Sequence, residues 1–197
     1  MKNVKESLDF VKRFLPVVKS YVVRNIRDIK PEFPLVLKIV SSKHVHKTEV
    51  KGVQIVKSQN ELEKAFKSLK KKSSEILVQD FVDGSELIIG IKQDSSFGHV
   101  VMFGIGGVFV ELLKDVSFRV CPVSEKDVES MINDLQAKDL LFGFRDKKPV
   151  SLNLLKKIIV KVSKIPEKYP NLKELDINPL IINDKKAFAV DARLELG

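Results

Sequence analysis

The order of apolar and polar residues predicts short helices and short strands that are interleaved along the whole chain. Apolar residues recur at helical spacing over 4–15, 59–69, 125–135 and 151–162. Ser58 and Ser124 precede two of these stretches and are expected to cap them, and Glu61 completes the sequence of a capping box with Ser58. Prolines are expected to end the first and last of these helices: Pro16, Pro166 and Pro170.

Runs rich in β-branched and aromatic residues predict the strands. They lie at 17–23, 35–40, 52–56, 76–82, 86–92, 99–103, 108–112, 117–120, 172–176, 180–182 and 187–191. The turn sequences at 83–84 and 94–98 predict hairpins and therefore antiparallel pairing, and 178–179 and 183–184 separate the last three strands. Because strands and helices do not alternate in strict βαβ units, the fold class expected is α+β.

Length and charge limit the classes of function. A chain of 197 residues fits one domain, or two small lobes around a cleft, and buries about 70% of its unfolded surface. Its net charge of +9 favours anionic ligands, whereas the absence of Trp and the presence of only two Tyr disfavour nucleic acid, because few aromatic side chains are available for stacking. No apolar run approaches the roughly 20 residues of a membrane span, no signal peptide begins the chain, and the single cysteine, Cys121, has no partner. We therefore expect a cytoplasmic protein.

Two cationic features have both a functional and a structural interpretation. Lys38 stands in an otherwise apolar strand, where it either binds a phosphate or points to solvent from an edge strand. His44 and His46 lie in a polar loop, where they are either incidental or include an acceptor of a phosphoryl group. A zinc site is disfavoured because the single cysteine is distant.

The glycine motif and the motif with Asn178 and Asp191 also have two interpretations each. The 104–107 sequence matches neither the Rossmann nor the P-loop spacing, so it is either a tight turn or a loop whose N–H groups approach an oxyanion. Asn178 and Asp191 fall on neighbouring strands of an expected hairpin and are either turn residues or ligands of Mg²⁺. Asp115 and Arg119 are compatible with solvated surface, and Cys121 is most simply a small buried apolar residue.

Eight motifs in one order resemble a known family. They are Val36-Leu37-Lys38-Ile39-Val40-Ser41, His46-Lys47-Thr48, 76–80, 86–90, 103–111, Asp115-Val116-Ser117-Phe118-Arg119, Gly143-Phe144-Arg145, and 175–180 with Val190-Asp191-Ala192-Arg193. From about Pro34 onward the chain resembles the ATP-grasp beta subunit of ADP-forming acetyl-CoA synthetase and, more distantly, that of succinyl-CoA synthetase. The resemblance implies an ATP-grasp fold in which two lobes, with mainly antiparallel sheets and flanking helices, enclose a nucleotide cleft.

The resemblance also implies boundaries and partners. Residues 1–197 form a single ATP-grasp domain, with a small lobe at 16–82, a large lobe at 83–197, and the helix at 3–15 packing on the large lobe. ATP or ADP and Mg²⁺ are the cofactors. The partner is an alpha subunit that carries the CoA site and a phosphohistidine, in an expected α2β2 assembly. We expect the pocket of the partner subunit to select the carboxylic acid.

Individual roles follow from the resemblance. Lys38 contacts the nucleotide phosphates, Glu86 lies near the ribose, His46 relays the phosphoryl group, and Asp176 orients the visiting phosphohistidine. Asn178 and Asp191 hold Mg²⁺. The remaining nucleotide contacts are expected at Gln79, Asp80, Phe81, Val82, Gly106 and Gly107.

The chain departs from the family pattern near the expected relay histidine and in the small lobe. Ser42-Lys43 replaces the usual Pro-Asp, Lys51-Gly52 replaces Gly-Gly, His44 replaces an aliphatic residue, and the segment before Pro34 is short. Three hypotheses follow from the sequence. The first is a subunit that phosphorylates ADP, the second is a regulatory nucleotide-binding module without a relay, and the third is a basic nucleic-acid binder.

Overall fold

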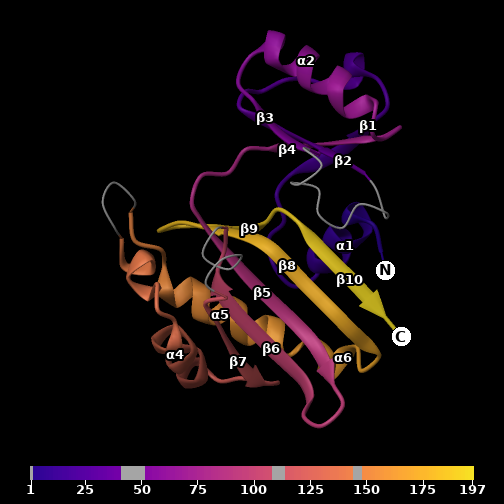
Figure 1. Ribbon diagram of the computed structural model, residues 1–197. Coiled ribbons are helices and arrows are strands. Elements are labelled where there is room, and N and C mark those ends of the chain that lie inside the picture. Colours follow the sequence, from indigo (N-terminus) through magenta and orange to yellow (C-terminus); the bar gives the residue numbers. More distant parts are fainter. Residues whose placement is uncertain (1, 41–51, 108–113, 144–147) are drawn as a thin grey trace. The chain divides into compact units, whose positions relative to one another are not determined.

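The computed structural model describes residues 2–40, 52–107, 114–143 and 148–197 (Figure 1). The chain forms two compact units: a larger one with Ser7–Val17 and Asp83–Gly197, and a smaller one with Asn3–Glu6 and Val18–Val82. Each unit contains its own antiparallel sheet and at least one helix. The α+β class expected from the sequence is therefore confirmed.

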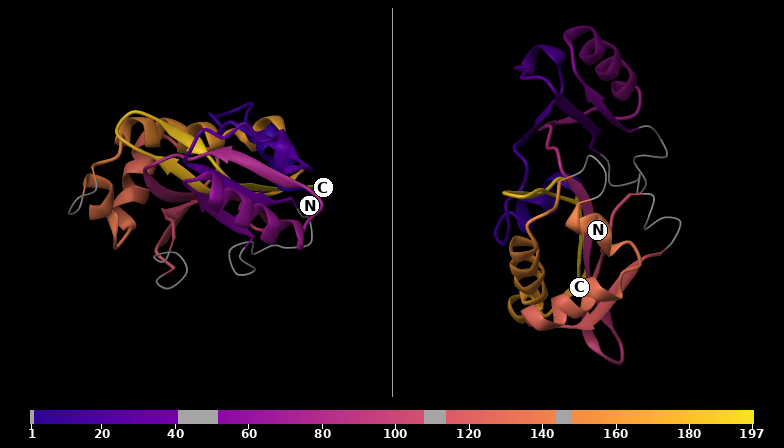
Figure 2. Two further views of the ribbon diagram at one scale, coloured as in Figure 1. Left: turned by 90° about the horizontal axis from the view of Figure 1, so that it is seen from above. Right: turned by 90° about the vertical axis from the view of Figure 1, so that its left-hand side faces the viewer.

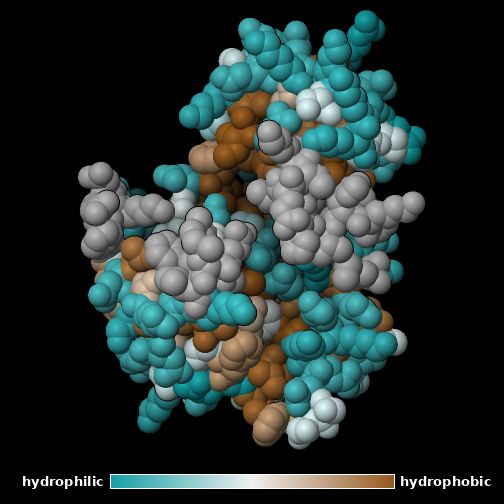
Figure 3. Space-filling model, in the orientation of Figure 1, coloured by the Kyte–Doolittle hydropathy of each residue, from teal (hydrophilic) through white to brown (hydrophobic). Residues whose placement is uncertain are grey.

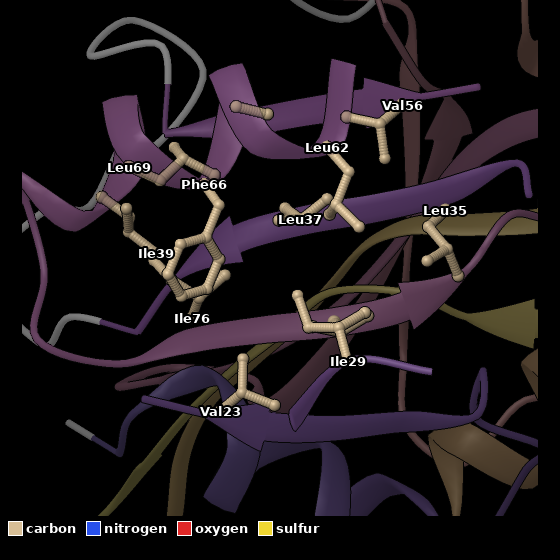
Figure 4. Packing of buried hydrophobic residues seen from close by; sticks show 12 residues of the cluster. Val23, Ile29, Leu35, Leu37, Ile39, Val56, Leu62, Phe66, Leu69 and Ile76 are labelled. Carbon is tan, nitrogen blue, oxygen red and sulfur yellow. The ribbon is translucent and has the colours of Figure 1, made fainter. Parts of the chain in front are cut away.

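The smaller unit is a four-stranded sheet with one helix. Its strands are ordered β1-β4-β2-β3 and every pairing is antiparallel. The elements are β1 (Ser20–Val23), η1 (Ile26–Asp28), β2 (Leu35–Ile39), β3 (Val53–Val56), α2 (Gln59–Lys70) and β4 (Ile76–Asp80). Leu62, Phe66 and Leu69 of α2 pack against Leu37 and Ile39 of β2, which makes a core on one face of the sheet (Figure 4). The alternate residues of each strand lie on the other face of the sheet, because successive residues of a strand point to opposite sides.

The start of α2 agrees only in part with the predicted capping box. The Ser58 side chain accepts the N–H of Glu61, as expected for the cap. The Glu61 carboxylate, however, accepts the backbone N–H of Lys57 at 2.7 Å, one residue before the cap. The complete box occurs instead at Ser124, where Asp127 supplies the returning carboxylate.

The larger unit is built on a six-stranded antiparallel sheet. Its order is β10-β8-β5-β6-β7, and β9 also pairs with β8. The strands are β5 (Ser85–Asp94), β6 (Gly98–Ile105), β7 (Val116–Val120), β8 (Leu172–Ile182), β9 (Ala187–Ala189) and β10 (Ala192–Leu196). Its helices are α4 (Glu125–Asp134), η2 (Lys138–Phe142), α5 (Leu152–Ser163) and α6 (Ile165–Lys168), together with the part of α1 (Val4–Val11) from Ser7 onward.

One face of this sheet carries the apolar core. Helix α5 contacts β5 and β6, and α4 contacts β7 and α5 (Figure 2). Ile89 and Ile91 of β5 and Val101 and Phe103 of β6 are almost fully buried on this side. Alternation therefore turns Ile88, Gly90, Met102 and their neighbours to the opposite face. No helix among the described residues is both long and apolar enough to cross a bilayer.

The predicted hairpin at 83–84 is wrong. Strand β4 belongs to the small sheet and β5 to the large one, because both sides of β4 are already paired, with β1 and with β2. Gly84 serves a close approach rather than a hairpin turn: a Cβ at this residue would lie 2.5 Å from the carbonyl oxygen of Ile182. The hairpin predicted around 94–98 does form, between β5 and β6.

Proline positions account for two further corrections. Asn178-Pro179 does not separate two strands but lies inside β8, where the register against β5 shifts between Leu87 and Ile89. Such an irregularity tolerates a proline, which has no N–H for the ladder. Pro166 lies within the short helix α6 rather than ending the helix before it. Strand β10 was not predicted, and the strand predicted at 108–112 lies outside the described residues.

Candidate functional site

The oxygen-bearing residues Asn178 and Asp191 lie side by side in the larger unit. The N–H of Asn178 donates to the carbonyl oxygen of Asp191 at 3.2 Å, and the N–H of Val190 donates to that of Pro179 at 3.1 Å. Oδ1 of Asp191 accepts the N–H of Ala192 at 2.9 Å, which orients the carboxylate. The amide of Asn178 is on an exposed residue. Two hard oxygen groups are thus held together at one edge of β8.

This pair fits a magnesium ion better than a softer metal. Mg²⁺ is commonly bound by one or two protein oxygens, with phosphates and water completing its coordination. Within the described ranges there is no group of three or more His, Cys, Asp or Glu residues that could hold a metal ion by themselves. The oxygen-only chemistry of Asn178 and Asp191 therefore suits a metal that arrives with a phosphate ligand.

Asp176 is an unusual carboxylate on the same strand. Its Oδ1 is buried and accepts no hydrogen bond from any described residue. The pKa of Asp176 is raised to about 6, chiefly by burial; the charge of Arg193 lowers it, and the charges of Glu174 and Asp191 add smaller increases. Arg193 of β10 is the direct cross-strand partner of Asp176. Among the described residues, Oδ1 of this carboxylate is consequently without a hydrogen-bond donor.

The glycine loop lies against Glu86. The N–H of Gly106 donates to the carbonyl oxygen of Glu86 at 2.7 Å, and a Cβ at Gly106 would come within 3.0 Å of that carbonyl group. Gly107 has φ of +70°, and a Cβ there would lie 3.7 Å from Oε2 of Glu86. Glycine is required at both residues, by the close approach at one and the left-handed backbone at the other. The loop and the carboxylate are therefore neighbours.

Lys38 and Gln79 share one face of the small sheet. Lys38 lies on β2, a central strand, and is paired with Leu77 and Val53; only 5% of its surface is exposed. The edge-strand interpretation of Lys38 is therefore wrong. Gln79 on β4 is 1% exposed and diagonally adjacent to Lys38, on the face opposite the α2 core.

The other residues expected to contact the nucleotide follow Gln79. Asp80 ends β4 and is exposed, with its N–H donating to the carbonyl oxygen of Lys19 at 3.1 Å. Phe81 is 40% exposed and Val82 is half-buried at the end of the smaller unit. His44 and His46 fall in 41–51, outside the described residues.

Two residues described above as compatible with solvated surface have structural roles. Asp115 is buried, and its two carboxylate oxygens accept the N–H groups of Gln136 and Ala137, each at 2.9 Å. Arg119 forms an ion pair of 2.9 Å with Asp134. Cys121 is half-buried, and burial raises the pKa of its thiol to about 12, which disfavours the thiolate form.

The sequence reasoning assigned no role to Arg193 or Gly90, although both lie beside Asp176 in the sheet. Arg193 is the cross-strand partner of Asp176 on β10, and Gly90 is its partner on β5. Arg193 could have been found from the period of two in a strand, because it follows Asp191 by two residues. Gly90 gave no signal, since its neighbours come from strands distant in the sequence.

Comparison with known proteins gives a family and several relatives. Residues 16–196 match the model of the ATP-grasp domain. The chain is 38% identical over 198 residues to the beta subunit of acetate–CoA ligase (ADP-forming) I of Pyrococcus furiosus, covering 92% of this chain and 85% of that one. It is also 38% identical over 206 residues to acetate–CoA ligase (ADP-forming) I of Archaeoglobus fulgidus, covering 93% of this chain. It spans only 30% of the length of that protein.

Solved structures of one further protein match over nearly the whole chain. Acetyl-coenzyme A synthetase 1 of Ca. Korarchaeum cryptofilum, in complex with coenzyme A and Ca-AMPCP, has a TM-score of 0.91 at 39% identity and covers 100% of this chain and 93% of its own. A second structure of that protein holds Mg-AMPPCP, with a phosphohistidine segment pointing towards the nucleotide-binding site. Its TM-score is 0.83 at 42% identity, covering 98% and 92% of the two chains.

Proposed function

Since this chain belongs to the ATP-grasp family and, within it, to the beta subunits of ADP-forming acetate–CoA ligases, we propose that it phosphorylates ADP from a partner's phosphohistidine. The overall reaction would convert acetyl-CoA or a related thioester, ADP and phosphate into the acid, CoA and ATP. The observation that carries this proposal is the row of three oxygen-bearing residues on β8 and beside it: Asp176, Asn178 and Asp191. Each fits one requirement of phosphoryl transfer.

The nucleotide phosphates need positive charge and hydrogen-bond donors. Lys38 lies on a central strand with only 5% of its surface exposed, and its ammonium group would supply a compact positive charge to a phosphate. Asn178 and Asp191 would hold Mg²⁺, which supplies positive charge to the phosphate oxygens. In the larger unit, the backbone of Gly106 and Gly107 would contact the phosphates and Glu86 would lie near the ribose. In the smaller unit, the segment from Gln79 to Val82 would contact the adenine. Positioning and charge of this kind account for most of the catalysis in phosphoryl transfer.

The phosphoryl group would move in two steps. First, the N–P bond of the partner's phosphohistidine breaks as a ring nitrogen of His46 forms a new P–N bond, and the proton lost by His46 passes to the donor imidazole. Then the P–N bond on His46 breaks as a β-phosphate oxygen of ADP forms the P–O bond of ATP, and the ring takes a proton from solvent. Asp176 accepts a hydrogen bond from the visiting imidazole and orients it.

The partner would be an alpha subunit that carries the CoA site and the phosphohistidine, in an α2β2 assembly. Relatives named as beta subunits support the existence of such a partner. The relative from Archaeoglobus is much longer than this chain, so some proteins of this kind contain further regions. We infer a cytoplasmic enzyme, because its nucleotide and thioester substrates are cytoplasmic metabolites.

Replacement of His46 tests the relay directly. We expect His46→Ala, co-purified with the alpha subunit, to lose ATP formation from acetyl-CoA, ADP and phosphate by about a thousandfold or more, because the covalent acceptor is gone. The dissociation constant of Mg·ADP, measured by calorimetry, should change by less than about threefold. His44→Ala, in the same loop, is the matched control and should retain activity.

The alternative is a regulatory nucleotide-binding module without a relay. Mg·ADP would bind this module equally well, but His46→Ala would leave turnover of the reconstituted complex unchanged. That result would remove the relay and leave only nucleotide binding. A competition experiment tests the hypothesis of a basic nucleic-acid binder. We expect duplex DNA at physiological salt to fail to displace Mg·ADP, which would exclude that hypothesis.

A further inference from the structure

Five residues form one line across the face of the large sheet that α5 does not cover. Cross-strand pairing joins each member to the next, from β10 through β8, β5 and β6 to β7. In that order they are Arg193, Asp176, Gly90, Met102 and Phe118. We call this line the docking row. It is charged at its β10 end and apolar at its β7 end, and it lies wholly within the larger unit.

The apolar half of the docking row is exposed at the edge of the sheet. Phe118 is 54% exposed and Val120, two residues further on the same strand, is 52% exposed. Val120 pairs with Val100 of β6, which extends the apolar surface by one position along the strands. Strand β7 ends the hydrogen-bonded order of the sheet. Apolar side chains, brown, lie among polar ones over the larger unit in the lower half of Figure 3. Exposed apolar surface at a sheet edge is typical of contact with another chain.

The polar side chains near Phe118 are turned to the other side. Arg119, between Phe118 and Val120, pairs with Asp134 of α4 and donates to the hydroxyl of Ser117. It also donates to the carbonyl oxygen of Phe118 at 2.7 Å. Strand β7 therefore presents an apolar face on the side of the docking row and a polar, internally bonded face on the side of α4.

Gly90 places an adjustable space in the middle of the row. It separates Asp176 from Met102, and a Cβ at Gly90 would lie 3.3 Å from the Cε of Met102. The end of the methionine side chain thus occupies the volume that a larger residue at this position would fill. Because methionine is unbranched and has several rotatable bonds, it can move aside with little loss of packing. An incoming ring can then reach Asp176 over the glycine.

The charged half of the row has the chemistry of a phosphorylated imidazole. Oδ1 of Asp176 is buried and accepts no hydrogen bond from any described residue, so it is suited to the N–H of a ring. Arg193, on the other side of Asp176, carries the positive charge that suits phosphoryl oxygens. The two halves are continuous, so the peptide that flanks a ring at Asp176 can lie over Met102 and Phe118 of the neighbouring strands.

Building on the proposed function, we infer that the docking row seats the phosphohistidine-bearing segment of the partner subunit. The phosphorylated ring occupies the Asp176 end, and the flanking peptide lies over Met102, Phe118 and Val120. Phe118 and Val120 are positioning residues, since they contact the carrier peptide and not the reacting atoms. Phosphoryl transfer should then depend on an apolar surface that takes no part in nucleotide binding.

The test uses the complete complex with the alpha subunit labelled as its ³²P-phosphohistidine form. Transfer of the label to ADP is followed in a single turnover, and the dissociation constant of Mg·ADP is measured on the same preparations. We expect Phe118→Asp and Val120→Asp each to slow transfer about tenfold or more, with the dissociation constant unchanged within about twofold. Phe97→Asp is the matched control: Phe97 is 68% exposed at the β5–β6 turn and lies off the row. It should transfer at the wild-type rate.

Several results would overturn this inference. They are a reduction of less than about threefold in both variants, an equal reduction in Phe97→Asp, or a loss of Mg·ADP affinity in step with the loss of transfer. A change in the oligomeric state of the chain by itself would assign the edge to self-association instead. Circular dichroism and the melting temperature identify a misfolded variant. If one of Phe118→Asp and Val120→Asp misfolds, the transfer rate of the other decides whether the inference holds.

Asp176→Asn separates this inference from the proposed function. If Asp176→Asn and His46→Ala stop transfer while Phe118→Asp and Val120→Asp do not, the relay stands and the docking surface is wrong. If none of the four slows transfer, the proposed function itself fails.

Discussion

The two sheets of this protein bury apolar side chains in the same way, but they carry different charged side chains on their other faces. Each is antiparallel, with an apolar core on one face. On its other face the small sheet buries a cation, Lys38, among apolar neighbours, whereas the large sheet holds a partly buried carboxylate, Asp176, beside an arginine and further acids. Burying either charge is unfavourable for the isolated chain. The comparison teaches that each unit holds a charge of opposite sign on the face away from its own apolar core, and that each charge can be removed separately.

Removing the cation of the small sheet should have the largest effect on nucleotide binding. We expect Lys38→Met to weaken ADP binding about a hundredfold, because a charge-assisted contact to phosphate is lost. The loss should be similar with and without Mg²⁺. Calorimetry with ADP, in the presence and in the absence of Mg²⁺, measures this loss.

Lys64→Met, on the exposed face of α2, is the control for the loss of one positive charge. It should bind ADP as the wild type does. Equal losses in both variants would mean that general attraction, and not a specific contact of Lys38, drives binding.

Replacing Asp191, a proposed Mg²⁺ ligand in the larger unit, should change ADP binding only through the loss of the metal. We expect Asp191→Asn to raise the Mg²⁺ concentration needed for ADP binding by about tenfold to thirtyfold, because one anionic oxygen is lost from the site. ADP affinity measured in EDTA should not change. A titration of ADP binding against Mg²⁺ gives both values. Asp184→Asn, in the exposed turn after β8, removes the same charge and should leave the Mg²⁺ requirement unchanged. An effect of Asp191→Asn that persists in EDTA would contradict the metal assignment.

The smallest effect concerns stability and pH at Asp176. Its pKa is raised to about 6 in the folded chain, mainly by burial, from an ordinary value of 3.8. The folded chain therefore retains this proton at a pH where the unfolded chain has lost it, so the free energy of unfolding falls as pH rises between about 4 and 6. Asp176→Asn has no charge to bury. At pH 7.5 its free energy of unfolding, measured in urea, should exceed that of the wild type by about 1–3 kcal/mol.

At pH 4.5 this difference should be much smaller, because Asp176 is then largely protonated in the folded wild type. The measurement is made in EDTA and without nucleotide, so that no ligand contributes to stability. Glu174→Gln, on an exposed residue of the same strand, should show no comparable gain at pH 7.5. A wild type that is as stable as Asp176→Asn at both values of pH would show that the carboxylate has another partner.

Much of the local structure could be predicted from the sequence, because the forces that decide it act between near neighbours. The caps predicted at Ser58 and Ser124 depend on residues three positions apart, although the complete box forms at Ser124 and not at Ser58 as predicted. The β5–β6 hairpin depends on a short turn. The hairpin predicted at 83–84 failed for the opposite reason: whether β4 can accept β5 depends on β1 and β2, which already occupy both of its sides.

The sequence by itself determined the fold class, the family resemblance, and the types of residue available for binding phosphate and metal. Only the tertiary structure decided that Lys38 is buried on a central strand, that Oδ1 of Asp176 lacks a hydrogen-bond donor among the described residues, and that Gly90 and Phe118 lie in line with Asp176. The physical reason is that burial and cross-strand register are set by strands far apart in the chain. The residues next to a given residue in the sequence do not determine which strand will lie beside it.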